Sequence, residues 1–367
     1  MVDLRICEPE TASNQIPLFI WDRNYADPAS VTSIYSNKYI DETQDLMVTA
    51  NLPSDNPTYQ INFRTISTNE EHPIAHGSRL ELTCRVPYDG DQEGHKAVFT
   101  VLGGSLAFYS EVSLGDDKID NYWSLHVWNW HEGGQPDDTY VLNDGYTLVD
   151  IRFLTAEKLL ALTSHCCIEL YDVENLSTAP QIQARFVLPV TLQILSLEYP
   201  SVFHSTSSCE DLTAPDERWI WTTVPVDRVI CLRMSYPRPI LVISARLLLV
   251  DIPPAWFDAT SEDGFAVPWS SWGPQNSRYF LRESPRFGVA GSRVIRQVLH
   301  GSSLRMHMTD FNPSAVDVTT YLPYVEMVNN DPDFDFFHRI ILDEEKILMF
   351  TRTDTTERAM DVDIIDM

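Results

Sequence analysis

Hydrophobic and polar residues alternate in short runs along this chain, and no long segment shows the 3.6-residue period of an amphipathic helix. The clearest example is the stretch Leu148–Leu176, in which Val149, Ile151 and Phe153 alternate with polar neighbours. Two turn-like segments separate this run from two further apolar runs. The stretch therefore predicts three strands joined by two tight turns, at 149–153, 158–163 and 166–173.

Looser copies of this three-strand unit recur along the chain. Each ends in a similar strand, at Tyr59–Ile66, Trp123–Trp130, Ile168–Val173, Leu247–Ile252, Leu304–Phe311 and Ala359–Ile365. An aliphatic strand precedes most of them, at Asp45–Ala50, Glu157–Thr163, Pro239–Ala245 and Asp343–Thr351. We align the copies at the equivalent positions Thr65, Asn129, Asp172, Asp251, Asp310 and Asp363.

A repeat of this size made only of strands is typical of a β-propeller blade, in which four strands bury a face against each neighbouring blade. Six units are clear, and Val2–Cys7 resembles the outer strand of another. We therefore predict an all-β chain with few or no long helices: a degenerate, WD40-like propeller of six or seven blades. It would form a single domain over residues 1–367, closed by pairing of its N- and C-terminal strands, which removes open sheet edges. The alternative is a pair of β-sandwiches or another irregular all-β fold.

Three segments interrupt the repeat and are expected to be loop insertions: Asp89–Glu93, Ser205–Glu217 and Pro253–Pro274. The last runs into the most unusual part of the chain, Val267–Phe280, which contains two tryptophans, a Gly-Pro pair and an arginine. It is either a recognition loop or a packed cap over the edge of the ring. Function is more expected in these insertions, up to Arg286, than in the repeat itself.

The chain is acidic, with a net charge of −27, which argues against nucleic acid as a partner. Its cations are mostly arginine, and the segment Arg218–Arg305 contains arginines but no lysine and is positive overall. Arginine binds carboxylates and phosphates through a planar fork, so this segment is either an anion-binding patch or a set of ion pairs with neighbouring segments. The residues selected for a protein-binding surface are Arg278, Arg282, Arg286, Trp269 and Trp272.

Cysteine usage and hydropathy indicate an intracellular protein of the cytoplasm or nucleus. The six cysteines include no C-x-x-C pair, and the adjacent Cys166 and Cys167 are expected on opposite faces of a strand in the core. No signal peptide is visible at the N-terminus. The longest apolar runs are too short to span a bilayer, so no membrane association is expected.

The sequence carries no recognisable catalytic or metal-binding motif, and we expect no catalytic residue, no cofactor and no metal site. His72 and His76 are four residues apart, but Pro73 argues against a helix there, and both are interpreted as loop residues. Asp331, Asp333 and Asp335 alternate as in a calcium loop but lack its glycine and its final glutamate. Two alternatives stay open: a propeller enzyme that acts on glycans through axial carboxylates, and a structural scaffold subunit.

Several stretches resemble the large family of fungal F-box proteins. They are DETQDLMVTA from Asp41, INFRTISTNEEHPIA from Ile61, WSLHVWNWHEG from Trp123, IRFLTAEKLLALTSHCCIELYDVE from Ile151, VPWSSWGPQNSRYF from Val267, GSRVIRQV from Gly291 and ILDEEKILMF from Ile341. The resemblance implies a degenerate propeller that recognises substrates for a cullin-RING ubiquitin ligase. No Leu-Pro-x-Glu-type opening of an F-box precedes or overlaps the stretch VDLRICEPETASNQIPLFIWD from Val2 to Asp22. We therefore expect a non-enzymatic interaction module with a protein partner of unknown identity. A cullin-ligase adaptor would bind only if a longer parent chain carries an F-box.

Overall fold

The computed structural model describes most of the strands of this chain and some of the turns between them. The described residues are 3–6, 33–41, 44–53, 58–77, 79–83, 95–114, 120–132, 140–144, 148–164, 166–189, 194–198, 224–234, 239–261, 264–280, 286–300, 303–312, 325–329, 337–342, 346–352 and 359–366. The expected insertions Asp89–Glu93 and Ser205–Glu217, together with Arg282 and the aspartates of the calcium-like loop, lie outside them.

The chain divides into two compact units. The first unit contains residues 17–186, and the second contains residues 1–16 and 187–367. Whether they form the single domain expected from the sequence stays a prediction, as do ring closure and the number of blades.

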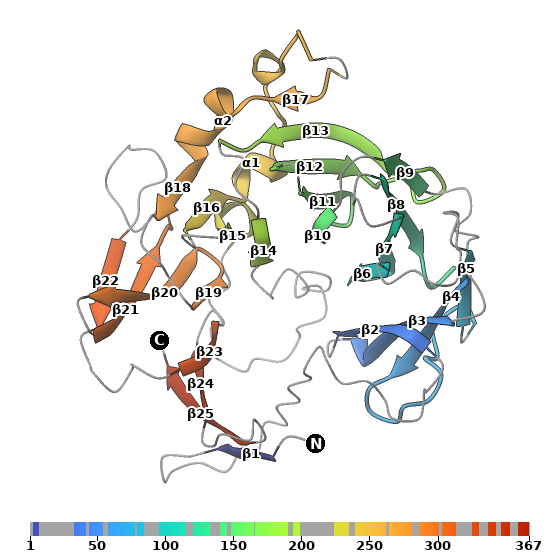
Figure 1. Cartoon of the computed structure of the whole chain (residues 1–367), viewed down its shortest axis with the longest axis horizontal. Coiled ribbons are helices and arrows are strands. Elements are labelled where there is room, and N and C mark those ends of the chain that lie inside the picture. The colour runs from blue at the N-terminus through green and yellow to red at the C-terminus, as the bar shows by residue number, and fades with distance from the viewer. Residues whose placement is uncertain are drawn as a thin grey trace, which may run out of the picture. The chain divides into compact units, whose positions relative to one another are not determined.

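The first unit is built from consecutive antiparallel strands, which are coloured from blue to green in Figure 1. Its sheets follow the orders β2-β3-β4-β5 and β6-β7-β8-β9, and a third sheet begins with the order β10-β11-β12-β13. The strands are β2 (Ser33–Asp41), β3 (Leu46–Pro53), β4 (Thr58–Thr65), β5 (Arg79–Thr83), β6 (His95–Leu102), β7 (Ser105–Leu114), β8 (Asp120–Asn129), β9 (Tyr140–Asp144), β10 (Leu148–Thr155), β11 (Lys158–Thr163), β12 (Cys167–Asp172) and β13 (Gln181–Val187).

The second unit repeats the pattern with the sheet orders β14-β15-β16-β18, β19-β20-β21-β22 and β1-β25-β24-β23. Its strands are β1 (Asp3–Ile6), β14 (Ile194–Glu198), β15 (Val229–Met234), β16 (Ile240–Ser244), β17 (Ala266–Val267), β18 (Ser277–Phe280), β19 (Phe287–Ala290), β20 (Arg293–His300), β21 (Ser303–Asp310), β22 (Val325–Asn329), β23 (Phe337–Leu342), β24 (Lys346–Arg352) and β25 (Ala359–Asp366). Its helices are short: η4 (Pro225–Asp227), α1 (Arg246–Leu249), η5 (Pro254–Trp256) and α2 (Trp269–Asn276). The prediction of a mainly β chain is thereby confirmed for the described residues.

Both faces of the central strands are buried in the first unit. In β7, Leu106 and Phe108 pack in a core shared with β3, β4 and β6. The alternate residues Ala107 and Tyr109 pack in a second core shared with β10, β11 and β12. Because successive side chains of a strand point to opposite faces, one strand serves two inter-sheet cores. This explains the near-continuous apolar character of these runs.

The tryptophans in β8 and directly after it follow the same rule. Trp128 and Trp130 belong to the core with β3 and β4, whereas Trp123 belongs to the core with β10 to β12. All three are at most 3 % exposed. They therefore pack between the sheets of the first unit.

One of the predicted final strands is wrong. Leu247–Ile252 is not a strand, because residues 246–249 form the single turn of α1 and the third strand of that sheet is β16, which ends at Ser244. A short apolar run has no period that separates a strand from a buried helical turn, and Leu247 and Leu248 are both buried. The final strand predicted at Ala359–Ile365 is confirmed, since β25 covers it.

A second correction concerns the adjacent cysteines. Cys166 precedes β12 and has a positive φ of 57°, so it belongs to the turn and does not continue the alternation of the strand. The strand begins at Cys167. Cys166 is nevertheless buried, as is Cys231.

Candidate functional site

The unusual segment Val267–Phe280 singled out from the sequence lies in the α2–β18 segment, which we define as residues 264–280. Trp272 lies on α2, is fully buried, and donates a hydrogen bond from Nε1 to the carbonyl of Val187 at 3.3 Å. The indole of Trp269 packs edge-on against it, with ring centroids 4.6 Å apart. A Cβ on Gly273 would overlap the Trp269 ring, so only glycine permits this contact. Trp272 therefore fastens α2 to the backbone at Val187, and Trp269 packs on Trp272 within the same helix.

The segment thus contains a packed cap, and it also presents accessible groups. Trp269 and Arg278 are half-buried, and Phe265 and Tyr279 are both 37 % exposed. Of the residues selected for binding, Trp272 has no exposed side chain, whereas Trp269 and Arg278 have atoms at the surface. Sequence reasoning left open whether the segment is a cap or a recognition loop, because both need aromatic residues and only burial separates them.

Several arginines of the positive segment are engaged inside the second unit. Arg246 pairs with Asp227 at 2.7 Å, and Arg293 pairs with Asp310 at 3.3 Å. Arg296 is 4 % exposed and lies over the ring of Phe280, 3.8 Å from its centroid, in a cation–π contact. The positive charge is therefore only partly available to a partner, as the ion-pairing alternative predicts.

Arg278 and Arg286 differ from these arginines. The guanidinium of Arg278 donates from Nη1 to the carbonyl of Ser277 at 3.2 Å. Arg286 is half-buried, and partial burial lowers the pKa of its guanidinium. Arg278 is the second residue of β18, and Arg286 directly precedes β19, which belongs to another sheet of the second unit. They are the arginines of the prediction that the structure describes.

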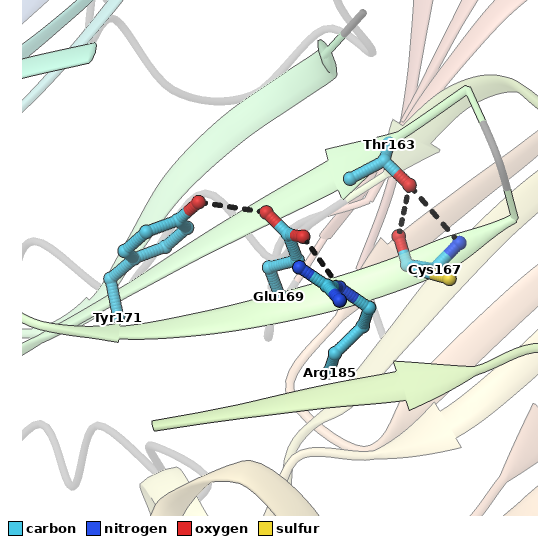
Figure 2. A network of polar contacts seen from close by, with 5 residues as sticks. All are labelled: Thr163, Cys167, Glu169, Tyr171 and Arg185. Carbon is cyan, nitrogen blue, oxygen red and sulfur yellow. Dashed lines mark hydrogen bonds and ion pairs between the residues drawn. The ribbon is translucent and has the colours of Figure 1, made fainter. Parts of the chain in front are cut away.

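A buried polar network occupies the sheet of β10 to β13 (Figure 2). Glu169 is fully buried on β12, where its Oε2 accepts a hydrogen bond from the hydroxyl of Tyr171 at 2.7 Å and its Oε1 pairs with Nε of Arg185 at 2.9 Å. At the other end of the strand, Thr163 Oγ1 donates to the carbonyl of Cys167 and accepts from its N–H, both at 3.2 Å. Both carboxylate oxygens of Glu169 are occupied by protein groups, so the network is suited to holding strands together rather than to proton transfer.

Cys167 beside this network is not an activated nucleophile. Burial raises the pKa of its thiol to about 11. A nucleophilic cysteine requires the opposite, a pKa lowered toward neutrality. The sequence analysis assigned the adjacent cysteines to the core. It did not predict the ion pair of Glu169 with Arg185, because a lone glutamate in a strand gives no signal of burial.

A second cluster lies in the first unit around Trp130. Its indole stacks on Phe63 with centroids 5.4 Å apart and contacts the imidazoles of His72 and His131 edge-on at 5.1 and 4.1 Å. Trp130 Nε1 donates to the carbonyl of Gly103 at 2.9 Å. His72 lies in a loop, as expected, but it is 7 % exposed, which the sequence did not indicate. His131 was not singled out at all.

Within the described residues, no three His, Cys, Asp or Glu side chains gather where a metal ion could be held. In the same part of the chain, the helices are too short or too polar to cross a bilayer.

Comparison with known proteins identifies no family. No protein-family model matches the chain, and no curated protein matches its sequence. Among solved structures, a chain of the COPII outer coat vertex on membranes matches with 12 % identity over 74 % of this chain and 61 % of that chain, with a TM-score of 0.40. Saccharomyces cerevisiae Sqt1 matches with 9 % identity over 86 % of this chain and 67 % of that chain, at 0.42. The WD40 beta propeller domain of Doa1 matches with 10 % identity over 86 % and 75 %, at 0.34.

This chain spans less than two thirds of the COPII chains that it matches, 61 % of one and 34 % of another. Every one of these TM-scores lies below 0.5. The description of this chain therefore rests on its own strands, sheets and contacts.

Proposed function

We propose that this chain is a non-enzymatic protein-interaction module on a WD40-like propeller scaffold, and that its partner binds at the α2–β18 segment together with Arg286, which directly precedes β19. The proposal rests on the difference between the buried face of that segment and its accessible residues. Its buried face is fastened by Trp272, while Trp269, Phe265, Tyr279 and Arg278 keep accessible atoms. Protein interfaces are enriched in aromatic residues and arginine, which bury a large area at a small entropic cost.

The chemistry of this surface favours a partner with carboxylates next to an apolar anchor. Arg278 and Arg286 supply positive charge in a chain whose net charge is −27. An acidic partner would be repelled by most of the molecule and attracted here, which orients the encounter.

We further propose that the partner is a ubiquitin-ligase substrate, as the resemblance to fungal F-box proteins implies. The role requires an F-box, supplied by a longer parent chain, to bind the adaptor of a cullin-RING ligase. Affinity capture with residues 1–367 should then recover a protein partner but no cullin adaptor. Direct adaptor binding by this chain would contradict the absence of an F-box from it.

Charge reversal tests the surface. The double variant Arg278→Glu/Arg286→Glu should weaken binding of the captured partner about tenfold or more in calorimetry, since two attractive charges become repulsive. It should also flatten the dependence of affinity on salt concentration.

The matched control is Arg79→Glu, because the Arg79 side chain is 41 % exposed on β5 of the first unit and pairs only at the surface with Glu81. This variant should bind like the wild type. Equal affinities of the wild type and the double variant, with unchanged circular dichroism, would remove the α2–β18 segment as the interface.

A further inference from the structure

Strand β5 forms one edge of the sheet β2-β3-β4-β5 in the first unit (Figure 1). Its residues pair with those of β4, from Arg79 opposite Asn62 to Thr83 opposite Thr58. Among the residues that the structure describes, no strand pairs with the other side of β5. That side therefore presents backbone N–H and C=O groups to which a further strand can bind.

The two faces of β5 differ in character. Arg79, Glu81 and Thr83 alternate with Leu80 and Leu82, so the polar and the apolar side chains point to opposite faces. The three polar residues are exposed. Leu82 is buried in the core shared with β3, β4, β6 and β7, whereas Leu80 packs against that core and is only partly buried. The apolar face of the edge is therefore incompletely covered at its centre.

The charges of β5 are self-complementary. The side chains of Arg79 and Glu81 are 41 % and 64 % exposed and form an ion pair of 3.0 Å along the strand. When two copies of β5 pair antiparallel about Leu80, Arg79 of each copy lies directly opposite Glu81 of the other. Directly opposite residues share a face of the sheet, so two ion pairs can form between the strands. A two-fold axis at Glu81 would instead place two carboxylates opposite each other, so the charges also select the register.

The other outer strands lack this complementarity. β9, β18 and β22 also end described sheets, and each carries charge of one sign only: Asp144 in β9, Arg278 in β18 and Glu326 in β22. These strands offer no opposite charge to a second copy. Charged residues on an edge strand generally discourage pairing with other chains. In β5 they disfavour the registers in which like charges meet and favour the register centred on Leu80.

We propose that β5 is a self-association edge, through which two copies of this chain pair antiparallel and form a symmetric dimer. The Arg79–Glu81 ion pairs lie on one face of the joined sheet, and the Leu80 side chains of the two copies meet on the other. The partner at this edge is thus a second copy of the chain. The inference is independent of the proposed function, because β5 belongs to the first unit and the α2–β18 segment to the second.

The size and charge of the chain predict a weak dimer. A strand of five residues extends about 17 Å, so the contact is small compared with stable protein interfaces. The net charge of −27 per chain also opposes association. At about 0.15 M salt, charges farther apart than about 8 Å are largely screened, so the adjacent cross-strand pairs decide the outcome. We therefore expect a concentration-dependent equilibrium between monomer and dimer.

Sedimentation velocity of the full chain at this salt concentration tests the proposal. The wild type should shift from monomer toward dimer as its concentration rises from micromolar to submillimolar. Arg79→Glu and Glu81→Arg each replace two attractive cross-strand pairs by two repulsive ones, so each should weaken dimerisation about tenfold or more. The matched control is Glu174→Arg, at an exposed position of the first unit, which changes the net charge by the same amount as Glu81→Arg. It should dimerise like the wild type.

Two combinations distinguish specific pairing from a general effect of charge. The double variant Arg79→Glu/Glu81→Arg restores opposite charges across the strands and should recover the wild-type dimer. An equimolar mixture of the two single variants should form heterodimers, because each chain carries the charges that the other requires. In the wild type, hydrogen exchange of the β5 amides should slow as the concentration rises, a measurement that needs no variant. A wild type that stays monomeric throughout, or single variants that dimerise as well as the wild type, would overturn the proposal.

Discussion

Several polar side chains in this protein form hydrogen bonds and ion pairs with one another inside the sheets. Glu169 shows this most clearly, since a fully buried carboxylate is unfavourable unless it is paired and hydrogen-bonded. Arg185 and Tyr171 meet that requirement from β13 and from the same strand (Figure 2). The arrangement joins two strands whose apolar neighbours alone would leave their register less specified.

Removing the carboxylate should be costly. Glu169→Ala leaves the Tyr171 hydroxyl and the Arg185 guanidinium without this acceptor, and we expect it to lower the free energy of unfolding by about 2–3 kcal/mol. Tyr171→Phe removes one hydrogen bond and should cost about 1 kcal/mol. Urea denaturation measures both, with the exposed Glu174→Ala as a control expected within about 0.5 kcal/mol of wild type. A Glu169→Ala variant as stable as that control would show that the network adds nothing.

The same backbone hydrogen bond recurs at the end of the third strand in several sheets. The residue after the strand donates its N–H to a carbonyl in the turn before the second strand. The pairs are Ile66 to Asp45, Trp130 to Gly104, Val173 to Glu157, Ala245 to Arg228 and Phe311 to Ser292, at 2.8 to 3.0 Å. In three of them the side chain of the last strand residue also accepts a hydrogen bond from the N–H two residues on; these residues are Asn129, Asp172 and Asp310. These bonds tie the end of the third strand to the turn before the second strand. The side-chain acceptors explain why polar residues recur at the last position of the third strand.

Substitution of Asp310 tests the contribution of these strand-end hydrogen bonds to stability. Its carboxylate accepts from the N–H of Asn312 at 2.9 Å and from the hydroxyl of Ser292 at 2.7 Å, and it pairs with Arg293. Asp310→Ala should lower the free energy of unfolding by about 1–2 kcal/mol. Asp310→Asn keeps an acceptor oxygen and should recover roughly half of that loss in thermal or urea unfolding. Equal losses in the two variants would assign the effect to the ion pair with Arg293 instead.

At the scale of the whole molecule, β1 and β25 bring the two ends of the chain into one sheet. β1 pairs with β25 in parallel register, from Asp3 opposite Ala359 to Ile6 opposite Val362. Without β1, the edge of β25 would present unpaired backbone groups, and exposed sheet edges promote aggregation. This short strand therefore protects the end of the second unit.

Deletion of residues 1–7 tests that role. The shortened chain should melt roughly 4–8 °C lower, for a loss of about 2 kcal/mol, and should aggregate faster on heating. A synthetic peptide of residues 1–8 added in excess should raise the melting temperature in a concentration-dependent manner, because it binds only the folded chain. A deletion variant with unchanged melting and no response to the peptide would contradict the prediction.

The hydrophobic pattern by itself determined that the chain is mainly β and repetitive, and it located most third strands to within a few residues. It did so because alternation along a strand and buried aromatic pairs leave a local signal. The same local signal placed a strand at Leu247–Ile252, where the chain turns through α1. The hydrophobic pattern did not decide whether Trp269 and Trp272 belong to a packed cap or to a recognition surface.

Only the tertiary structure decided which polar residues are buried and what they meet. Glu169 receives Arg185 from sixteen residues away, and His72 reaches Trp130 across two sheets. Burial of a charge or an imidazole depends on strands that are distant along the chain and adjacent in space, so no spacing in the sequence reports it. The repeat is therefore legible in the sequence, whereas the buried ion pair, the partly exposed arginines and the histidine pair around Trp130 become visible only when the sheets are packed together.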